Sequence, residues 1–408
     1  MSVFDYDIAV RRQFSGRFEP NRLEDIAWYR DYIANGAPGG PPVLLSMGEN
    51  WEGPSEALLS KARSAPAHLH GYQFSLWGET SMVETLMDWV PGDYGLSANE
   101  AFGVAACWSG TRGALFDLGR IMGERKPGSG LVYATPGYDY GDVMATGGLM
   151  PRPVLVLRGE RAEVNYCCLL DALDASVAAV VLNVQHNPLG YQLPEPVLGK
   201  IFDRCLHFGI VPIFDDAHVA VIEPGATRVN GLRLWLDAVA QAGNVAEWYL
   251  VRSFGKQLNC NGWGIGLIAG PQPQLERLVL GLRTEREYSI HAARQWAIAQ
   301  HLASGAAAVD AERLCARVAR NRAALRRAVP DFLPLAGQVC TPFSWFPIPA
   351  WLDRARIMRE TGVLLGALVP SPMRRKAEFD GFARIYLGVH EDVFAAALAR
   401  LGPLFRDG

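Results

Sequence analysis

Residues 247–270 read EWYLVRSFGKQLNCNGWGIGLIAG, and they place one lysine, Lys256, between two apolar runs. The flanking runs EWYLVRSF and GIGLIAG are rich in β-branched, aromatic and other apolar side chains, which favours strands. The glycines between them are typical of a tight turn. The stretch therefore predicts two strands of one sheet, with Lys256 just after the first. Two interpretations of the lysine follow: a solvated surface charge, or an amine that holds a cofactor.

Four further apolar runs lie upstream of this stretch. They are GLVYATP, RPVLVLRG, SVAAVVLNV and GIVPIFDD. Between the last two, PEPVLGKIFDRCLHFG repeats apolar residues at helical spacing, and Gly209 is placed to end that helix. Short strands that alternate with helices are typical of a mostly parallel sheet with helices packed on its faces. We therefore expect an α/β fold.

The chain of 408 residues is too long for one ordinary core. After Pro271 the pattern changes to long Ala-rich and Arg-rich helical stretches, then the strand-like FARIYLG and a final helix. We predict an N-terminal arm over residues 1–45, a large α/β domain over residues 46–285 and a smaller α+β domain over residues 286–408. The arm is expected to join the smaller domain.

The composition excludes several classes of protein. Lys and Arg total 39 against 42 Asp and Glu, so no excess of positive charge indicates a nucleic-acid or anionic-membrane partner. The start, MSVFDYDIAVRRQF, carries charges where a signal peptide needs an apolar stretch, and no apolar run approaches the roughly 18 residues of a membrane span. We expect a cytoplasmic protein. The 7 cysteines show no CxxC or Cys/His spacing, so no metal site is predicted.

Polar residues follow three of the predicted strands at the point where each strand ends. Asn187 follows AAVVLNVQH, Asp215 follows GIVPIF, and Lys256 follows YLVRSFG. Ligands of open parallel sheets bind at the carboxyl ends of the strands, so these side chains are expected to meet. A helix start in CWSGTRGALF, at residues 109–111, offers free N–H groups that suit a phosphate. An amine, a carboxylate, an amide and a phosphate-binding helix end together indicate a site for an aldehyde cofactor.

Seven segments of the chain belong to this pattern. They are HGYQFSLWGETSMVETLMDWV, SGTRGALF, ATPGYDY, NVQHNPLG, VPIFDDAH, SFGKQLNCNGWGIG and FARIYLG. In this order they resemble a family's tyrosine-containing stretch, phosphate loop, Pro-x-Tyr stacking segment, Asn-Pro-x-Gly motif, ring-nitrogen aspartate strand, Schiff-base lysine segment and substrate-carboxylate arginine segment. That family is the fold type I pyridoxal phosphate enzymes, the class I/II aminotransferases and their relatives. One segment alone is a weak signal, but seven in the family's order are a strong one.

The resemblance implies that pyridoxal 5'-phosphate is the cofactor and that an amino acid is the substrate. Lys256 would form a Schiff base with the cofactor and then move the substrate's α-proton, while Asp215 would keep the pyridine nitrogen protonated. Arg384 would hold the substrate carboxylate, and Gly48 would contact the substrate. The resemblance also implies a homodimer with shared active sites, in which Tyr72 reaches the phosphate across the interface. The other expected cofactor-binding residues are Ser109, Gly110, Thr111, Tyr138, Asn187, His218, Arg252 and Ser253.

Four positions depart from the family's pattern, and the first is Gly255, which stands before the lysine where serine is common. Gly264 stands where members usually carry a phosphate-binding arginine, and Arg252 and Arg112 are the candidate replacements. His218 stands where a tyrosine usually donates to the ring oxygen, and a neutral imidazole can donate in the same way. Leu189 replaces the usual threonine of the Asn-Pro-x-Gly motif. These departures argue against a housekeeping aspartate or aromatic aminotransferase and suit a divergent enzyme of specialised metabolism.

The sequence leaves the reaction open. Frequency within the family favours an aminotransferase. The alternatives are elimination, replacement or cyclisation at the β or γ carbon, reaction with oxygen, and a non-catalytic pseudoenzyme.

Each residue also has a purely structural interpretation. Asp215, in a doublet with Asp216, is a candidate cap for the next segment, and Asn187 before proline is typical of a turn. Tyr138 is a candidate core residue, and Arg384 is a candidate partner for an acid on the last helix. Residues 109–111 could form an N-cap without a ligand.

Overall fold

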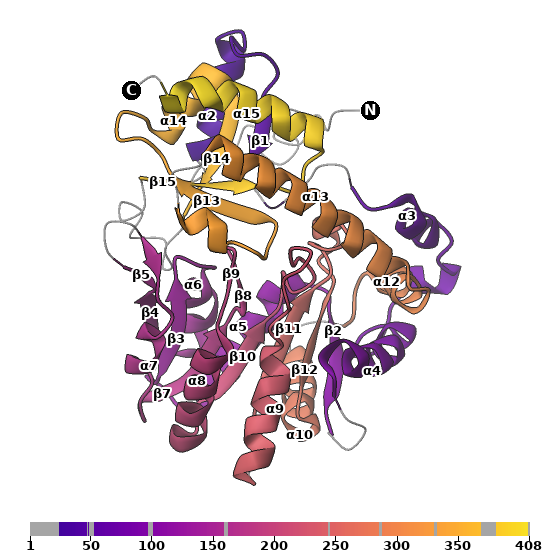
Figure 1. The fold of residues 1–408 in the computed structure, drawn as a ribbon. Helices are drawn as coiled ribbons and strands as arrows, with labels where there is room; N and C mark the ends of the chain where they lie inside the picture. Colours follow the sequence, from indigo (N-terminus) through magenta and orange to yellow (C-terminus); the bar gives the residue numbers. More distant parts are fainter. Residues whose placement is uncertain are drawn as a thin grey trace.

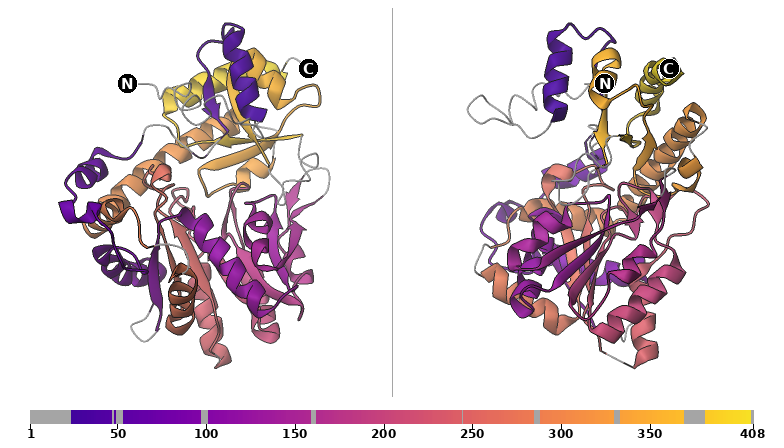
Figure 2. Two further views of the ribbon diagram at one scale, coloured as in Figure 1. Left: turned by 180° about the vertical axis from the view of Figure 1, so that it is seen from behind. Right: turned by 90° about the vertical axis from the view of Figure 1, so that its left-hand side faces the viewer.

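The structure is a computed structural model, and it describes residues 24–46, 48, 53–96, 101–158, 162–243, 245–284, 288–329, 333–368 and 381–406. Two units are visible in Figure 1: a large one built on a 7-stranded sheet and a smaller one built on a 4-stranded sheet. The smaller unit lies over one end of the large sheet, and Figure 2 shows the same arrangement from two other directions.

The large sheet has the strand order β2-β12-β11-β10-β7-β3-β4. Its strands are β2 (Gly103–Cys107), β3 (Gly130–Thr135), β4 (Met150–Leu155), β7 (Val177–Leu182), β10 (Val211–Asp215), β11 (Tyr249–Ser253) and β12 (Gly266–Gly270). β12 runs antiparallel to both of its neighbours, and the other neighbouring pairs run parallel. β7 is buried at all six positions, as expected for a parallel strand covered on both faces. The predicted α/β fold with a mostly parallel sheet is confirmed, although β2 was not among the predicted strands.

Helices cover both faces of this sheet. The face that we call the front face is turned away from the viewer in Figure 1, and it carries α5 (Gly110–Arg125), α6 (Tyr140–Met144) and α10 (Gln272–Arg277). The opposite face, which we call the back face, carries α4 (Thr80–Tyr94), α8 (Glu195–Phe208), α9 (Gly231–Ala242) and α12 (Ala292–Ala303). Successive residues of β11 point to opposite faces, because Leu250 belongs to the back core and Val251 to the front core. Helix α8 ends at Gly209, whose φ of 65° is left-handed, as the sequence predicts.

The smaller unit is a sheet of order β1-β14-β15-β13 covered by helices. Its elements are β1 (Val43–Leu45), β13 (Phe343–Pro347), β14 (Val363–Ala367), β15 (Phe382–Tyr386), α13 (Ala306–Ala328), α14 (Arg354–Thr361) and α15 (Glu391–Arg406). Helix α2 (Glu24–Ala34) joins this unit, since Tyr29 and Tyr32 pack against Met358 of α14 and Leu364 of β14. Residues 1–23 of the expected arm lie outside the described residues.

Helix α12 belongs to the large unit by its packing. Its buried residues Ala297, Ile298, Ala299 and Leu302 lie in the back core of the large sheet. The chain passes into the smaller unit only along α13 (Figure 1), so we place the boundary there and not at residue 286. The spacing of apolar residues predicts a helix but not which core buries its apolar face, so the sequence did not indicate that α12 packs on the large sheet.

Shorter elements connect these parts. They are α3 (Glu56–Arg63), α7 (Cys168–Asp171), β5 (Leu157–Arg158), β6 (Glu163–Val164), β8 (Gln185–His186), β9 (Tyr191–Gln192), the 3-10 helices η1 (Ala67–His70), η2 (Ala145–Gly147), η3 (Asn261–Trp263) and η5 (Leu333–Gly337), and the π-helix η4 (Leu278–Arg283). Within the described ranges, no helix combines the length and apolar character that a membrane crossing requires.

Candidate active site

Lys256 lies in the turn after β11 and points toward the smaller unit. Its Nζ donates a hydrogen bond to the carbonyl oxygen of Gly48 at 3.1 Å, and the Asn261 side chain donates to the same oxygen at 3.2 Å. The turn requires glycine at position 255, since a Cβ there would lie 2.9 Å from the Cα of Asn261. Lys256 is half-buried and bridges the two units, so the surface-charge interpretation does not describe it.

Gly48 is wedged between this amine and an aromatic ring. A Cβ at position 48 would lie 3.2 Å from Nζ of Lys256 and 2.6 Å from Cζ of Phe343, so only glycine fits without a shift. The guanidinium of Arg384 lies over the same Phe343 ring, 4.6 Å from its centre, and donates to the carbonyl oxygen of Ser46 at 2.7 Å. The lysine and the arginine therefore lie beside the same small group of residues: Phe343 of β13, and Ser46 and Gly48, which follow β1.

His218 connects this group to the large sheet. It is buried, and its ring centre is 5.6 Å from that of Phe343 in an edge-to-face arrangement. Burial lowers the pKa of His218 to about 3, and the positive charges of Lys256 and Arg384 lower it further. The imidazole is therefore neutral at pH 7. Its buried Nδ1 has no hydrogen-bond partner among the described residues.

Asp215 is the last residue of β10 and is buried on the front side of the sheet. The Tyr140 hydroxyl donates to Oδ2 of Asp215 at 2.6 Å, and the Ala217 amide donates to Oδ1 at 3.3 Å. Burial raises the pKa of Asp215 to about 6, and the neighbouring Asp216 carboxylate also acts to raise it. Asp215 does not cap a helix, because no helix starts in the segment that follows it.

Asn187 and Tyr138 lie at the ends of neighbouring strands. The Asn187 backbone amide donates to the side chain of Asn183, which in turn donates to the carbonyl oxygen of Asp215 at 2.6 Å. The buried side-chain oxygen of Asn187 has no partner in the part of the chain that the structure describes. Tyr138 is half-buried, and its ring lies 5.4 Å from that of Tyr140, which holds Asp215. These contacts bring the asparagine, the tyrosine and the aspartate to one edge of the sheet.

The predicted phosphate loop joins β2 to α5. The Gly110 amide donates to the carbonyl oxygen of Gly264 at 2.7 Å, and Gly110 has a left-handed φ of 68°. A Cβ at position 264 would lie 3.3 Å from the carbonyl oxygen of Trp108, so position 264 lies against the loop. Ser109 and Thr111 stand at the exposed start of α5. Position 264, where the family usually carries a phosphate-binding arginine, therefore lies beside the predicted phosphate loop, but it is occupied by glycine.

Arg112 lies beside this loop. It belongs to the first turn of α5, and its guanidinium donates to the Tyr138 hydroxyl at 3.1 Å and to Asp139 at 2.8 Å. Its side chain is 55% exposed, which leaves it accessible to a bound anion. Arg112 is therefore the candidate cation that the geometry favours.

Arg252 does not share this location. Its side chain is buried and donates to Asp93, Tyr94 and Gln257. Along β11 it points to the back face with Leu250, whereas α5 covers the front face with Val251 and Ser253 on that side. The expectation that Arg252 binds the phosphate is corrected, because its guanidinium lies across the sheet from the helix start.

Tyr72 stands apart from these residues within the chain. Its side chain is 85% exposed and neighbours Phe74, which is 73% exposed and packs edge-to-face on Tyr288. Beside it lies a hollow of about 680 Å³ lined by residues that include Trp263 and Arg294. A role for Tyr72 thus requires a second molecule and stays a prediction.

Three contacts of the site were not predicted from sequence. Tyr140, Phe343 and Asn261 hold Asp215, Arg384 and the Gly48 carbonyl respectively. Tyr140 and Asp215 are 75 residues apart, and Asn261 and Gly48 are 213 apart. Only the paired tyrosines in ATPGYDY gave a signal, and that signal could not tell which tyrosine reaches the carboxylate.

Comparison with known proteins assigns the family. A family model described as aminotransferase class I and II matches residues 43–345. The chain belongs to this family. Its members use pyridoxal phosphate.

The chain is similar to several aminotransferases. The probable N-succinyldiaminopimelate aminotransferase DapC of Mycobacterium tuberculosis is 27% identical over 301 residues, which span 72% of this chain but only 64% of that protein. The aspartate aminotransferase of Geobacillus stearothermophilus is 24% identical over 58% of each chain. A double mutant of Thermus thermophilus aspartate aminotransferase has a similar fold, with a TM-score of 0.77 at 20% identity over 97% of this chain and 98% of that one.

The residues present fit pyridoxal phosphate. The side-chain oxygen of Asn187 and Nδ1 of His218, both buried and without partners among the described residues, call for polar groups that the described chain does not supply. The buried Asp215 carboxylate suits a protonated ring nitrogen, and the Lys256 amine suits an aldehyde. The pyridoxal phosphate would be held by Asn187, His218, Asp215, Lys256 and the start of α5.

Replacing Arg112 with alanine is expected to weaken cofactor binding by about tenfold, because a charge-assisted hydrogen bond to a phosphate is lost. Equilibrium dialysis of the cofactor-free protein against pyridoxal phosphate measures the dissociation constant. Arg120→Ala, farther along α5, is the matched control because Arg120 pairs with Glu124. Equal affinities for Arg112→Ala and the parent would exclude Arg112 as the phosphate cation.

The buried Asp215 carboxyl also predicts a pH-dependent stability of the cofactor-free protein. Its folded pKa of about 6 exceeds the ordinary value of 3.8, so the folded protein holds this proton up to a higher pH than the unfolded chain does. Between about pH 4 and pH 6, ionisation then lowers the free energy of unfolding, by up to about 3 kcal/mol. Asp215→Asn, which keeps an oxygen for Tyr140, is expected to be more stable than the parent at pH 7 but not at pH 4. Urea unfolding at both pH values tests this, and an equal difference at both would contradict it.

Proposed function

We propose that this protein is a pyridoxal phosphate-dependent aminotransferase that acts at the α-carbon of an amino acid. The observation that carries the proposal is the convergence on the Phe343 ring of Arg384, of the buried His218, and of Gly48, which bonds to Lys256. His218 lies three residues beyond Asp215. Membership of the class I and II aminotransferase family supports it.

Each residue of the site has a task in this reaction. When bound, the cofactor would supply an aldehyde for the amine and a pyridine ring that draws electrons from the α-carbon. The Lys256 amine would act as the base and acid that move the α-proton. Asp215, as a buried carboxylate, would hold a proton on the ring nitrogen, since its charge is poorly screened there. Arg384 would orient the substrate carboxylate through two parallel hydrogen bonds.

His218, together with Phe343 and Gly48, determines the polarity around the reacting atoms and how far water reaches them. A neutral imidazole donates one hydrogen bond without adding positive charge, so His218 would hold the ring oxygen as a polar neutral group. Gly48 lies against the Lys256 amine with the Phe343 ring on its other side, and the two would keep water from the amine. A dry site strengthens each of the charged contacts.

A homodimer completes the proposal. Tyr72, Phe74 and Tyr288 form an exposed aromatic surface, which is unusual on a monomer and typical of an interface. We infer that a second copy covers this surface and that Tyr72 contacts the partner's cofactor phosphate. Size-exclusion chromatography with light scattering would show the mass of the assembly.

The deciding experiment incubates the purified protein, loaded with pyridoxal phosphate, with a panel of amino acids and identifies the products by mass. An oxo acid together with aminated cofactor supports amino transfer. Ammonia without aminated cofactor, or a new carbon–carbon or carbon–heteroatom bond, excludes it as the main reaction. Absence of any reaction with every amino acid, in a protein that binds the cofactor through Lys256, would identify a pseudoenzyme.

One observation favours a second candidate, elimination or replacement at the β or γ carbon. Such reactions move a second proton, and the buried Nδ1 of His218 is a polar atom without a partner among the described residues. The product analysis above separates the two candidates, since elimination releases ammonia or the leaving group.

A further inference from the structure

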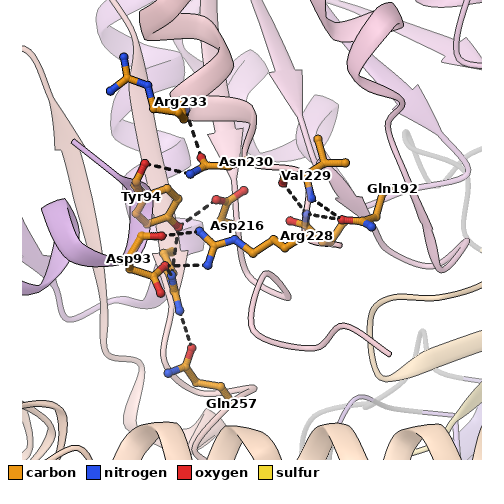
Figure 3. Close-up of polar contacts among 11 residues, drawn as sticks. Asp93, Tyr94, Gln192, Asp216, Arg228, Val229, Asn230, Arg233 and Gln257 are labelled. Carbon is orange, nitrogen blue, oxygen red and sulfur yellow. Dashed lines mark hydrogen bonds and ion pairs between the residues drawn. The ribbon is translucent and has the colours of Figure 1, made fainter. Parts of the chain in front are cut away.

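A cluster of polar residues lies on the back face of the large sheet, behind the site. It consists of Asp93, Tyr94, Asp216, Arg228, Arg252 and Gln257, and we call it the back cluster. Figure 3 shows the side chains of Asp93, Tyr94, Asp216 and Arg228 directed toward one another, with Gln257 at one end. Sequence reasoning did not find it, because its members come from four separate segments.

Arg252 lies at the centre of the back cluster. Its Nη1 donates to Oδ2 of Asp93 at 2.5 Å and to the Tyr94 hydroxyl at 3.2 Å, and its Nη2 donates to Oε1 of Gln257 at 3.0 Å. The guanidinium also lies over the Trp89 ring, 4.4 Å from its centre. The side chain is only 2% exposed, so these contacts hold it in one position.

The cluster continues from Arg252 to the end of β10. The Tyr94 hydroxyl donates to Oδ2 of Asp216 at 2.9 Å, and the Asp216 amide donates to the carbonyl oxygen of Val251 at 2.9 Å. A continuous path of hydrogen bonds therefore runs from Gln257 through Arg252 and Tyr94 to Asp216.

The two ends of this path are the chain neighbours of two site residues. Gln257 follows Lys256, and Asp216 follows Asp215. Asp215 ends β10 and lies on the front side, whereas Asp216 bonds to Tyr94 on the back side, so this end of the path holds the backbone of the carboxylate from behind. Gln257 follows Lys256 in the turn after β11, so its bond to Arg252 holds the backbone that carries the amine. The relative position of these two groups matters, since both would act on the same bound ring.

Stability alone is a poor explanation for such a cluster. Asp93 also accepts from Arg228 at 3.1 Å. Arg252 and the Asp216 carboxylate are buried, whereas the side chains of Arg228 and Asp93 are 25% and 23% exposed. Buried ion pairs of this kind are often replaceable by apolar side chains without loss of stability, because desolvation offsets the attraction. Their benefit is a fixed geometry that apolar packing does not specify.

We propose that Arg252 is a positioning residue which, through Gln257 and Tyr94, fixes the distance between Lys256 and Asp215. This inference rests on the proposed function. It gives Arg252 a role different from the phosphate contact expected from sequence.

The test uses Gln257→Met, which removes the bond to Arg252, and Tyr94→Phe, which removes the bonds to Arg252 and Asp216; both keep the approximate shape of the side chain. The first readout is the pH titration of the absorbance of the cofactor linked to Lys256, measured without substrate. Its midpoint is expected to shift by about half a pH unit or more, since the linkage senses the position of the nearby charges. The second readout is kcat, expected to fall by about tenfold with KM within about twofold, because misplaced groups affect the transition state most.

Two further variants separate positioning from general loss of structure. Gln257→Glu keeps an acceptor for Arg252 and is expected to restore the midpoint and most of kcat. Arg233→Ala is the control, since it removes an exposed ion pair with Asp237 near the back cluster. If Gln257→Met does not fold, Tyr94→Phe, which lacks only a hydroxyl, carries the test.

The outcomes distinguish the two proposals. Wild-type midpoint and kcat in folded Gln257→Met and Tyr94→Phe would overturn the positioning role and leave the aminotransferase proposal intact. A parent protein without lysine-linked cofactor would overturn both. Equal losses in Arg233→Ala would show that the effect is not specific to the path, and would also overturn the positioning role.

Discussion

Lys256→Ala is expected to lower the rate of amino transfer by about a thousandfold or more and to remove the borohydride-reducible link to pyridoxal phosphate. Two functions are lost together, because the same amine would hold the aldehyde and move the α-proton. No other described lysine contacts Gly48, so none takes its place. Treatment with borohydride followed by mass measurement of the intact protein detects the link, and single-turnover kinetics measure the rate.

Lys200→Ala is the matched control for this prediction. Lys200 is exposed on α8, a helix on the back face of the sheet, so its loss is expected to change neither the link nor the rate. A mass increase for Lys256→Ala after borohydride, equal to that of the parent, would show that a different amine holds the cofactor. The central assignment of the site would then be wrong.

Asp215→Asn is expected to lower kcat by about a hundredfold or more while the variant still binds the cofactor. The amide keeps an oxygen for the Tyr140 hydroxyl, but it carries no charge to hold a proton on the ring nitrogen. Without that proton the ring withdraws electrons poorly, and the α-proton leaves slowly. Steady-state kinetics with the best substrate of the panel measure the effect.

The same variant links function to stability. In the cofactor-free protein the ionised Asp215 is a cost at pH 7, since burial raises its pKa to about 6. Asp215→Asn is thus expected to gain stability and lose activity together, as buried charges at functional sites often do. Asp203→Asn, on the exposed side of α8, serves as the control for both measurements. A fully active Asp215→Asn would show that the ring nitrogen needs no partner here.

The structure also accounts for the sequence-based expectations that needed correction. Arg252 sits four residues before Lys256, and sequence distance alone suggested that it could reach the phosphate. Its position on β11 puts it on the back face with Leu250, where its guanidinium donates hydrogen bonds to Asp93 and Tyr94. The alternation of residues along a strand does not predict which helix packs on which face of the sheet. Arg112 was equally plausible from sequence, and only the placement of α5 beside Tyr138 favours it.

The sequence by itself determined the alternation of strands and helices, and through it the edge of the sheet at which Asn187, Asp215 and Lys256 meet. It could do so because polar residues after buried parallel strands must emerge at the same edge. The tertiary structure alone showed how the smaller unit closes over that edge: the Phe343 ring lies between Gly48 and the Arg384 guanidinium, two residues that the sequence had already indicated. It also decided that Tyr140 holds Asp215 and that Arg252 lies behind the sheet. The physical reason is that such contacts join residues far apart in the chain, and their geometry depends on how the two units pack.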